Sequence, residues 1–467
     1  MKKERKKGFQ MPSAFSILFL IIFALALVTH LIPEVQSATL AQTIMAAPKG
    51  FSDAIDVCVF VICIGGFLGV VAKTGALDAG IATIVKKMNG NELMLIPVLM
   101  LVFSLGGTSY GMCEETMAFY VLVVGTMMAA GFDAMVGAAT ILLGAGVGCL
   151  GSTVNPFAVS AAIDALQGAH PDIVVNQTIV IGLGALLWLV TLALSIVYVY
   201  NYAKKVKATG KSILSATERA ASEAEYGKGV SNDVEMTGSQ KIALGLFAFS
   251  FVVMIISLIP WWSFGLDMPA WTAALTGVPF GDWYFQELQA WFTIMAVIIG
   301  IVAKLPEKEI VSSFIAGAAD MMSVVLVIAV SRGISVLMAE TGLDMYVLDN
   351  ASAALSGVNG GLFAVGSFVI YIGLSFLIPS SSGLAAASMP TFGALAHSIG
   401  LSPEVMITIF CAASGLVNLV TPTSAVVMGG TALSKIEYPT WLKFALKLVA
   451  VLTVVCLIIV SVAMIVL

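Results

Sequence analysis

The stretch that decides the fold of this chain is GCLGSTVNPFAVS, residues 148–160. It lies between long runs of alanine, valine, isoleucine and leucine, yet its centre consists of glycine, serine, threonine, asparagine and proline. A proline inside a helix removes a backbone donor and displaces a carbonyl, so Asn155-Pro156 predicts an unwound turn. Within a membrane, such a turn is tolerated only where protein, water or a ligand meets the freed groups.

The composition identifies an integral membrane protein. The 467 residues are 59% hydrophobic and only 10% charged, with a mean hydropathy of +1.03, whereas a soluble domain is about 25% charged. The six cysteines include no CxxC pair and no Cys/His cluster with metal-ligand spacing. This argues against a disulfide framework or a zinc site.

Since a spanning helix needs about 20 apolar residues, we expect roughly 9–11 spans. The candidates lie near residues 13–33, 52–73, 134–166, 174–201, 241–262, 289–304, 311–339, 404–435 and 441–466. Two of them, 134–166 and 404–435, are too long for a simple span and carry a polar break. We expect each of these two to be a broken helix.

Two further apolar regions have polar midpoints. Region 92–131 contains GGTSYGMCEE (106–115), and region 360–398 contains PSSSG (379–383). Two apolar arms around a polar tip predict a re-entrant hairpin, which enters the membrane and leaves on the same side.

The basic residues predict the orientation of the chain, because cytoplasmic loops carry an excess of lysine and arginine. The N-terminal KKERKK (2–7) places the N-terminus in the cytoplasm, ahead of a retained first span, and the C-terminus outside. If 92–131 is a hairpin entered from the cytoplasm, the other loop lysines also fall inside: Lys73, Lys86, Lys87, Lys204, Lys205, Lys207, Lys211, Lys304, Lys308 and Lys435.

Two loops complete this layout. The polar, mixed-charge linker 203–240 is predicted to be cytoplasmic and partly disordered. The loop 263–288 and its flanks are predicted to form an aromatic belt at the outer interface, with Trp261, Trp262, Trp271, Trp283 and Tyr284.

The chain contains an internal repeat. VVAKTGALDAG (70–80) resembles LMAETGLDMYV (337–347), and each is followed by a polar-tipped hairpin and a broken span. Asp53 matches Asp320 at an offset of 267, and Pro156 matches Pro422 at an offset of 266. The lysine pattern gives the two halves opposite orientations. We therefore divide the chain into a first inverted repeat (1–202), the linker (203–240), and an extra span with the second inverted repeat (241–467).

Inverted repeats with paired broken helices indicate a secondary transporter, with its site where the breaks meet. The breaks supply oxygen atoms that suit Na⁺ or a polar substrate, and helix N-termini after each break suit a carboxylate. The residues predicted for Na⁺ are Ser152, Thr153, Asn155, Thr421 and Ser424. The alternative is that proline, serine and threonine merely kink a span and bond to their own backbone.

The charged residues within the spans leave several alternatives open. Glu114 and Glu115 could bind a cationic substrate group, carry a proton, or pair structurally with Arg332 or a helix end. Arg332 could contact a substrate carboxylate, or it could have a structural partner such as Asp320. Asp53 and Asp56 lie close to a span end, where we expect solvated side chains.

One motif is misleading. Residues 146–151 spell GxGxxG, but no strand precedes them, so glycine for close helix packing is the better explanation. The sequence also lacks a Walker A sequence, HExxH and GxSxG. We therefore expect neither an enzyme nor a nucleic-acid-binding protein.

Five segments resemble the YfcC-type transporters, which belong with the C4-dicarboxylate carrier-like proteins of the ion transporter superfamily. They are GMCEETMAFYVLVVGTMMAAGFD, GAGVGCLGSTVNPFAVSAA, SRGISV, IPSSSGLAAASMP and GLVNLVTPTSAVVM. The resemblance covers the whole chain apart from the tail, the linker and the aromatic loop. It implies an all-α inverted-repeat fold in a bacterial cytoplasmic membrane. A transport domain would hold the hairpins and breaks, a scaffold domain would form a homodimer, and transport would be elevator-like and ion-driven.

The same resemblance implies a set of substrate-binding residues. With the charged candidates, the set is Thr108, Ser109, Glu114, Glu115, Asn155, Arg332, Ser380, Ser381, Ser382, Gly383, Asn418, Thr421 and Thr423. YfcC-type members are commonly labelled basic amino-acid antiporters for arginine or ornithine, which suits the two glutamates. Dicarboxylate transporters of the superfamily more often show Ser-Asn-Thr tips, which this chain lacks.

We therefore expect a secondary active transporter of a small charged organic solute, in the first place a basic amino acid. Coupling to Na⁺, to H⁺ or to exchange stays open, and no other cofactor is expected. The alternatives are a Na⁺-coupled transporter of C4-dicarboxylates or peptide-like carboxylates, and an ion channel.

Overall fold

The computed structural model describes residues 14–77, 79–80, 83, 91–227, 236–259 and 261–467. Within these ranges the chain forms helices and turns and contains no strand. The first half holds α1 (Ala14–Thr29), α2 (Leu40–Asp53), α3 (Ile55–Lys73), α5 (Leu95–Tyr110), α6 (Tyr120–Ala129), α7 (Ala134–Leu150), α8 (Ala161–Ala169) and α9 (Gln177–Thr209). The basic N-terminus, Lys86 and Lys87 lie outside the described residues.

A linker helix and the second half follow. They hold α10 (Ala216–Tyr226), α11 (Gly238–Leu258), α12 (Phe285–Val302), α13 (Glu307–Asp320), α14 (Met322–Thr341), α15 (Leu343–Leu355), α16 (Gly360–Leu377), α17 (Ser381–Ser398), α18 (Pro403–Asn418), α19 (Ala425–Leu433) and α20 (Tyr438–Val466). In the described part of the chain, eight helices are long and apolar enough to cross a membrane. The multi-pass, all-α fold is thereby confirmed.

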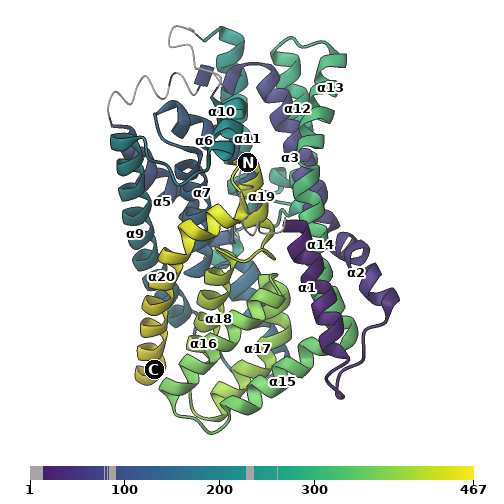
Figure 1. Ribbon diagram of the computed structural model, residues 1–467, viewed down its shortest axis with the longest axis vertical. Coiled ribbons are helices and arrows are strands. Elements are labelled where there is room, and N and C mark those ends of the chain that lie inside the picture. Colours follow the sequence, from purple (N-terminus) through teal and green to yellow (C-terminus); the bar gives the residue numbers. More distant parts are fainter. Residues whose placement is uncertain (1–13, 78, 81–82, 84–90, 228–235, 260) are drawn as a thin grey trace, which may run out of the picture.

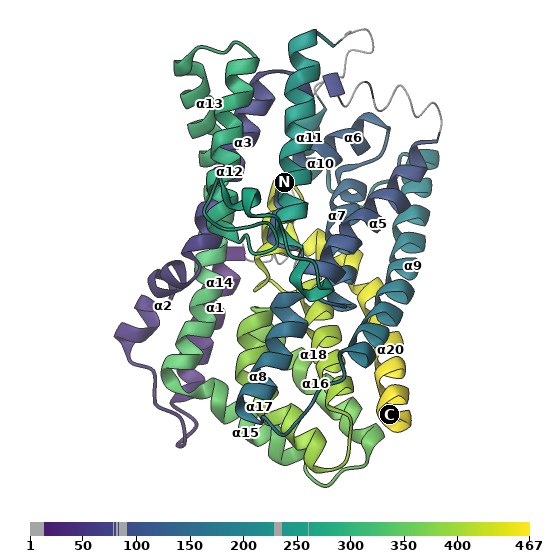
Figure 2. The ribbon, with the colours of Figure 1, turned by 180° about the vertical axis from the view of Figure 1, so that it is seen from behind.

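Both predicted hairpins are present, and they enter from opposite ends of the molecule. In Figures 1 and 2, α5 and α6 lie in the upper half, whereas α16 and α17 lie in the lower half. At the ends of the first hairpin, Glu92 pairs with Lys207 at 2.6 Å and Asp133 accepts a hydrogen bond from Tyr202 at 2.6 Å. Both contacts are near the C-terminal end of α9, so the hairpin begins and ends on one side.

Each hairpin packs against a broken helix. The first predicted break separates α7 from a π-helical turn, Pro156–Ser160, that leads into α8. The second separates α18 from α19. Helix α7 packs on α5 and α6, and α18 packs on α16 and α17. The same helix order and packing thus recur in the two halves.

The repeat is clearest where the two halves interlock. Helix α2 packs on α14, and its repeat-equivalent α13 packs on α3. Cys58 lies at hydrogen-bond distance from the carbonyl of Val325, with its sulfur 3.8 Å from the oxygen. These two residues are equivalent at the offset of 267. Equivalent residues that touch each other lie on either side of the rotation axis that relates the halves, so the axis passes between α3 and α14.

Small residues permit this interlocking. A Cβ on Gly50 of α2 would come within 2.3 Å of the Ala329 carbonyl oxygen. A Cβ on Gly317 of α13, the equivalent position, would come within 2.2 Å of the Gly65 carbonyl oxygen. Both helix pairs therefore pack with backbone against backbone, which only glycine allows.

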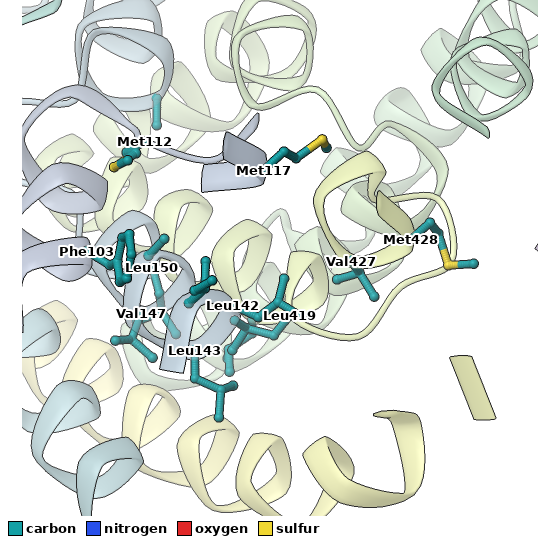
Figure 3. Close-up of a cluster of buried hydrophobic side chains, with 14 of the residues drawn as sticks. Phe103, Met112, Met117, Leu142, Leu143, Val147, Leu150, Leu419, Val427 and Met428 are labelled. Carbon is teal, nitrogen blue, oxygen red and sulfur yellow. The ribbon is translucent and has the colours of Figure 1, made fainter. Parts of the chain in front are cut away.

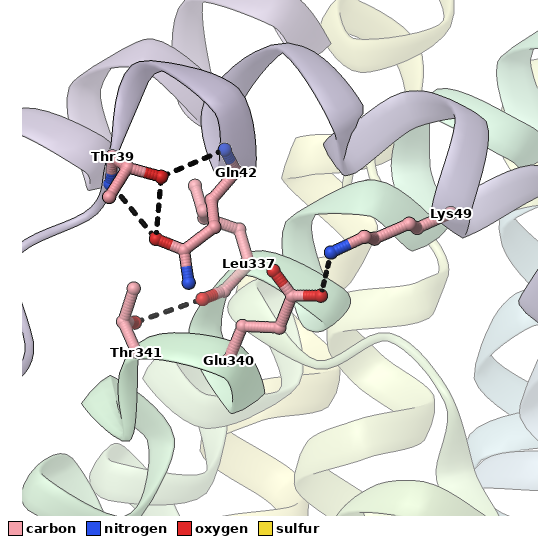
Figure 4. A network of polar contacts seen from close by, with 6 residues as sticks. All are labelled: Thr39, Gln42, Lys49, Leu337, Glu340 and Thr341. Atoms are coloured by element: carbon pink, nitrogen blue, oxygen red, sulfur yellow. Dashed lines mark hydrogen bonds and ion pairs between the residues drawn. The ribbon is translucent and has the colours of Figure 1, made fainter.

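Two parts of the helix layout differ from the sequence-based expectation. The predicted span 311–339 is two helices, α13 and α14, which meet at Met321. Helix α2 was not predicted. It begins with a capping box formed by Thr39 and Gln42, and its Lys49 pairs with Glu340 of α14 (Figure 4). With fourteen residues, including Lys49 and Asp53, it is too short and too polar to suggest a span.

The linker is also more ordered than expected over its described residues. Helix α9 continues to Thr209, and α10 packs against α6. The Tyr226 hydroxyl donates to the Leu433 carbonyl at 2.5 Å, which joins the linker to α19. Residues 203–227 are therefore ordered, and residues 228–235 of the predicted linker lie outside the described ranges.

The glycines of the GxGxxG motif serve helix packing, as expected. A Cβ on Gly148 would meet the Ser104 carbonyl oxygen of α5 at 2.3 Å, and one on Gly151 would meet Trp188 of α9 at 2.3 Å. Around them, apolar side chains of α5, α7, α19, the first tip and the second break form a buried cluster (Figure 3). This core fixes the first tip and both breaks relative to one another.

Candidate functional site

Both hairpin tips and both helix breaks line one cavity of about 170 Å³. From the first tip and first break come Gly111, Cys113, Glu114, Glu115, Asn155, Phe157 and Ala158. From the second tip and second break come Pro379, Ser380, Ser381, Ser382, Asn418, Thr423, Ser424, Ala425 and Val426. Residues more than 300 positions apart in the sequence therefore meet at one place, as the paired motifs predict.

The first tip presents two carboxylates to the cavity. Helix α5 ends at Gly111, whose φ of +79° is a left-handed conformation that favours glycine. The chain then forms a 3₁₀ turn, Glu114–Phe119. The Glu115 side chain is 4% exposed, and its Oε2 accepts a hydrogen bond from the Cys113 amide at 3.1 Å. Glu114 lines the cavity beside it.

The first break is held open by its own polar side chains. Asn155 Oδ1 accepts a hydrogen bond from the Phe157 amide at 3.0 Å, and Asn155 Nδ2 donates to Ser152 Oγ at 2.9 Å. Ser152 Oγ donates to the Cys149 carbonyl at 2.6 Å. The asparagine thus caps the helical turn that follows the break, and this turn starts at the cavity.

The second tip is neutral. Ser380 Oγ accepts a hydrogen bond from the Gly383 amide at 3.2 Å and thereby caps α17. Ser380, Ser381 and Ser382 line the cavity. Asn418, at the end of α18, lies with its Nδ2 3.5 Å from the Pro379 carbonyl oxygen, which connects this tip to the second break.

A threonine in each break binds the first arm of its own hairpin. Thr153 Oγ1 donates to the Thr108 carbonyl at 3.0 Å, and Thr423 Oγ1 donates to the Phe376 carbonyl at 2.9 Å. The matching contacts in the two halves make each hairpin and its broken helix one mechanical unit. The second break is also anchored to α14, since Ser331 Oγ donates to the Thr423 carbonyl.

Arg332 of α14 lines the cavity and has an unexpected partner. Its Nε is 3.0 Å from Asp53 Oδ2 at the end of α2, although 53% of the Asp53 side chain remains exposed. Both sequence-based interpretations need correction, because Arg332 does not pair with Asp320 and Asp53 is not simply solvated. The packing of α2 across α14 explains the change, since it places Asp53 beside the guanidinium. Among the described residues, no ion pair joins Arg332 to Glu114 or Glu115.

Several predicted site residues do not line the cavity. Thr108 is 3% exposed and donates to the Gly151 carbonyl at 2.6 Å, so its hydroxyl connects the first tip to the first break. Ser109 donates to the Leu105 carbonyl at 2.6 Å. The remaining members of this group are also not among the lining residues: Ser152, Thr153, Gly383 and Thr421. Their predicted binding roles remain predictions.

The five residues predicted for Na⁺ fall into two groups, one in each break. The Ser152 and Thr153 hydroxyls donate to carbonyls and so keep oxygen lone pairs that could face a cation. Thr421 Oγ1 is 2.7 Å from Thr423 Oγ1, and Ser424 Oγ caps α19 at 3.5 Å from the Val427 amide. The donor set consists of hydroxyl and amide oxygens, the kind of ligand that a small hard cation takes.

The sequence reasoning missed an aromatic wall. Tyr284 and Phe285, at the start of α12, line the cavity together with Phe157. The rings of Phe157 and Tyr284 are 5.3 Å apart between centroids. Tyr284 was assigned to an outer belt, and its position directly before a spanning helix was the only available signal. Trp271 and Trp262 are exposed, as that belt requires.

Two cysteines were also missed. Cys113 of the first tip and Cys149 at the end of α7 line the cavity, with 3.2 Å between their sulfurs. Their spacing of 36 residues in the sequence matches no cysteine motif. Only the prediction that the tip and the break meet could have brought them together.

Comparisons with known proteins give a consistent family. Residues 38–466 match the family DcuC, C4-dicarboxylate anaerobic carrier. An uncharacterized protein of Haemophilus influenzae is 32% identical over 406 residues, covering 86% of this chain and 74% of its own length. The "Putative basic amino acid antiporter YfcC" of Escherichia coli is 25% identical over 415 residues, covering 86% of this chain and 76% of its own.

Two solved structures are similar over nearly the whole chain. MtrF of Neisseria gonorrhoeae, described with a class of antimetabolite efflux pumps, has a TM-score of 0.44 at 16% identity, covering 98% of this chain and 96% of its own. The YdaH transporter of Alcanivorax borkumensis has a TM-score of 0.46 at 14% identity, covering 97% and 98%.

Proposed function

The chain belongs to the DcuC family of membrane transporters, and from that premise we propose that it is a secondary active transporter of a small charged organic solute, in the first place a basic amino acid. The observation that carries the proposal is the single cavity to which both tips and both breaks contribute. A site built from two inverted halves can open to either side of a membrane by moving one part of the protein against the other.

The charges around the cavity favour a cationic solute. Glu114 and Glu115 face it, while the positive charge of Arg332 is largely compensated by Asp53 at 3.0 Å. An arginine or ornithine side chain would bring one positive charge to the two carboxylates. A guanidinium can also bond to both oxygens of a carboxylate at once, which adds geometric specificity.

The α-carboxylate of the same solute would meet groups on the other wall. The helical turn after Asn155 and helix α19 after Ser424 both begin at the cavity. Helix N-termini present free backbone N–H groups and partial positive charge, which suit an anion. The serines of the second tip add neutral donors.

A C4-dicarboxylate is the second candidate, and the family description together with Arg332 favours it. A dicarboxylate would have to approach two glutamates within the same cavity, which costs free energy unless they are protonated. A peptide-like carboxylate meets the same obstacle. An ion channel is a weaker alternative, because the cavity is closed by two opposed tips.

The proposed mechanism divides the molecule into a moving domain and a fixed one. We take the hairpins, broken helices, α9 and α20 as the moving transport domain, and α1–α3 with α11–α14 as a scaffold that forms a homodimer. Movement would be elevator-like, coupled to Na⁺ at the breaks, to H⁺ at the glutamates, or to exchange. The chain would lie in the bacterial cytoplasmic membrane, with the N-terminus and linker inside and the C-terminus outside.

Thermal-shift measurements on the purified protein test the substrate. Arginine and ornithine should raise the melting temperature by mass action, and succinate and neutral amino acids should raise it less, each with and without Na⁺. In Glu114→Gln/Glu115→Gln the arginine shift should disappear. The exposed Glu223→Gln variant is the matched control. A succinate shift that exceeds the arginine shift in the unchanged protein would replace the first candidate by the second.

Reconstituted vesicles test whether the protein is a carrier. Uptake of labelled arginine should saturate and should accelerate when unlabelled arginine is present on the opposite side. Flux that rises linearly with concentration at channel-like rates would contradict a carrier.

A further inference from the structure

A second hollow lies far from the central cavity, between α9, α20 and the start of the linker. It measures about 720 Å³ and is open to the surface. Its lining consists of Leu194, Val197, Tyr198, Asn201, Tyr202, Lys205, Lys211, Ser212, Ile213, Lys443, Phe444, Lys447, Leu448 and Val451. We call it the α9–α20 groove. Nothing in the proposed transport cycle uses it.

The floor of the groove is a rigid aromatic contact. Phe444 packs between Tyr198 and Tyr202, with ring centroids 5.1 and 5.0 Å apart. The Tyr198 hydroxyl donates to the Phe444 carbonyl at 2.7 Å. The Tyr202 hydroxyl donates to Asp133 and accepts from the Ile213 amide at 3.1 Å, which fixes the linker at the rim. These contacts hold α9 and α20 together, so the groove between them is preformed.

One end of the groove is strongly basic. Lys205 and Lys211 reach it from α9 and the linker, and Lys443 and Lys447 from successive turns of α20. All four are exposed, and among the described residues none has an ion-pair partner within 4.0 Å. The nearby Asp133 is already engaged by Val136, Tyr202 and Ser212. The four positive charges are left for a ligand.

The other end is apolar. Val197 is 58% exposed and Val451 is 50% exposed, and Leu194 lies beside them. Leu194 is eleven residues from Lys205 on the same helix, which is about 16 Å along the axis. The apolar end thus lies toward the interior of a membrane, while the lysines lie where both helices leave it. This is the polarity of a phospholipid, with an anionic headgroup followed by acyl chains.

We infer that the α9–α20 groove binds an anionic phospholipid, whose phosphate lies among Lys205, Lys211, Lys443 and Lys447 and whose acyl chain runs along Leu194, Val197 and Val451. Basic pockets between spanning helices are suited to such headgroups. A second copy of this chain fits poorly, because a symmetric contact would bring the same four lysines together. A free phosphate would leave the apolar half of the groove unused.

Native mass spectrometry of the purified full-length protein tests the inference with phosphatidylglycerol and phosphatidylcholine of equal chain length. Phosphatidylglycerol should remain bound at least fivefold more than phosphatidylcholine. Each lysine near a headgroup contributes about a fivefold change in binding, so Lys443→Gln/Lys447→Gln should weaken phosphatidylglycerol binding about 25-fold. Lys241→Gln/Lys308→Gln removes the same charge from α11 and α13 and should change it less than twofold.

Soluble probes separate a lipid from a small anion. Inorganic phosphate and glycerol 1-phosphate at millimolar concentration should fail to displace the bound lipid and should leave the melting temperature unchanged. Effective displacement by either would reduce the groove to a small-anion site. Equal retention of the two lipids, or unchanged binding in Lys443→Gln/Lys447→Gln, would overturn the inference. Substrate binding in the central cavity is a separate measurement, so the two proposals can fail independently.

Discussion

At the tip of the first hairpin two glutamates face the cavity, whereas at the tip of the second hairpin three serines face it. The two tips are carried by similar backbones, since each hairpin packs on a broken helix whose threonine bonds to the first arm. The symmetry places two polar tips opposite each other, and the side chains then decide what each tip can bind. Backbone symmetry and chemical asymmetry are therefore separate properties of this site.

The two interlocked helix pairs, α2 with α14 and α13 with α3, also combine a symmetric backbone with different side chains. At the offset of 267, Arg332 is equivalent to Gly65, and Asp53 is equivalent to Asp320. Arg332 pairs with Asp53, but the mirrored pair cannot form, because a Cβ on Gly65 would already come within 2.6 Å of the Gly317 carbonyl oxygen. The positive charge therefore enters the cavity from one half only.

The largest effect should come from disrupting the close glycine packing that the two halves share. Gly50→Ala and Gly317→Ala each place a Cβ within 2.3 Å of a backbone atom. Overpacking of this kind costs about 1–3 kcal/mol or more, so both variants should lose much of their folded protein, and to a similar degree. The melting temperature and the elution profile measure this. Gly245→Ala, where the space is open, is the control. A large difference between Gly50→Ala and Gly317→Ala would contradict equivalent packing.

The next-largest effect, on transport, should differ between equivalent positions of the two halves. Arg332→Gln breaks the ion pair with Asp53 and leaves the Asp53 carboxylate uncompensated, so that it competes with Glu114 and Glu115 for the cationic group of the solute. Arginine transport at subsaturating concentration should therefore fall about tenfold, as for one misplaced charged hydrogen bond. Asp320→Asn, at the position equivalent to Asp53, should stay within about twofold of the unchanged protein. Initial uptake rates in vesicles give both values. Equal losses would show that the asymmetry of Arg332 has no functional weight.

A smaller effect should appear at the close Cys113–Cys149 pair, which lies in one half only. Cys149 is equivalent to Gly415 at the offset of 266, and Cys113 and Cys149 both line the cavity. Saturating arginine should slow their alkylation by N-ethylmaleimide several-fold, because the solute covers them. Peptide mass spectrometry measures the labelling, with the fully buried Cys456 of α20 as an internal reference. Unchanged labelling rates would place the solute elsewhere.

The smallest effect concerns the linker, which lies outside the repeats. Burial alone raises the pKa of Glu218 on α10, but hydrogen bonds from Ser215 and from the Glu437 amide at 2.9 Å outweigh it, so the net pKa is lowered. A lowered folded pKa means that this contribution is present above the unfolded pKa, near 4.5, and is lost as pH falls below it.

Glu218→Gln should therefore cost about 1 kcal/mol at pH 7 and little near pH 3. Melting temperatures across this pH range measure the difference, and Glu223→Gln on the exposed face of α10 is the control. A constant difference at all pH values would mean that the carboxylate charge is not what joins α10 to α20.

Much of this architecture could be predicted from the sequence, because proline, glycine and charge act locally. Asn155-Pro156 and Thr421-Pro422 mark the breaks, and both fall where helices end. The hairpins follow from polar tips between apolar arms. The contacts that local patterns do not encode were missed. The pairing of Arg332 with Asp53 depends on how α2 crosses α14, and the position of Tyr284 depends on how α12 approaches the cavity.

The contact between Cys58 and Val325 has a consequence for motion. If the two halves exchange their local conformations to turn the cavity from one side of the membrane to the other, every residue is carried to the place of its equivalent. Cys58 and Val325 are each other's equivalents and lie beside the rotation axis, so the exchange returns this pair to the same place. The Cys58–Val325 separation should therefore stay constant through the cycle and provide a fixed pivot against which displacement of the tips can be measured.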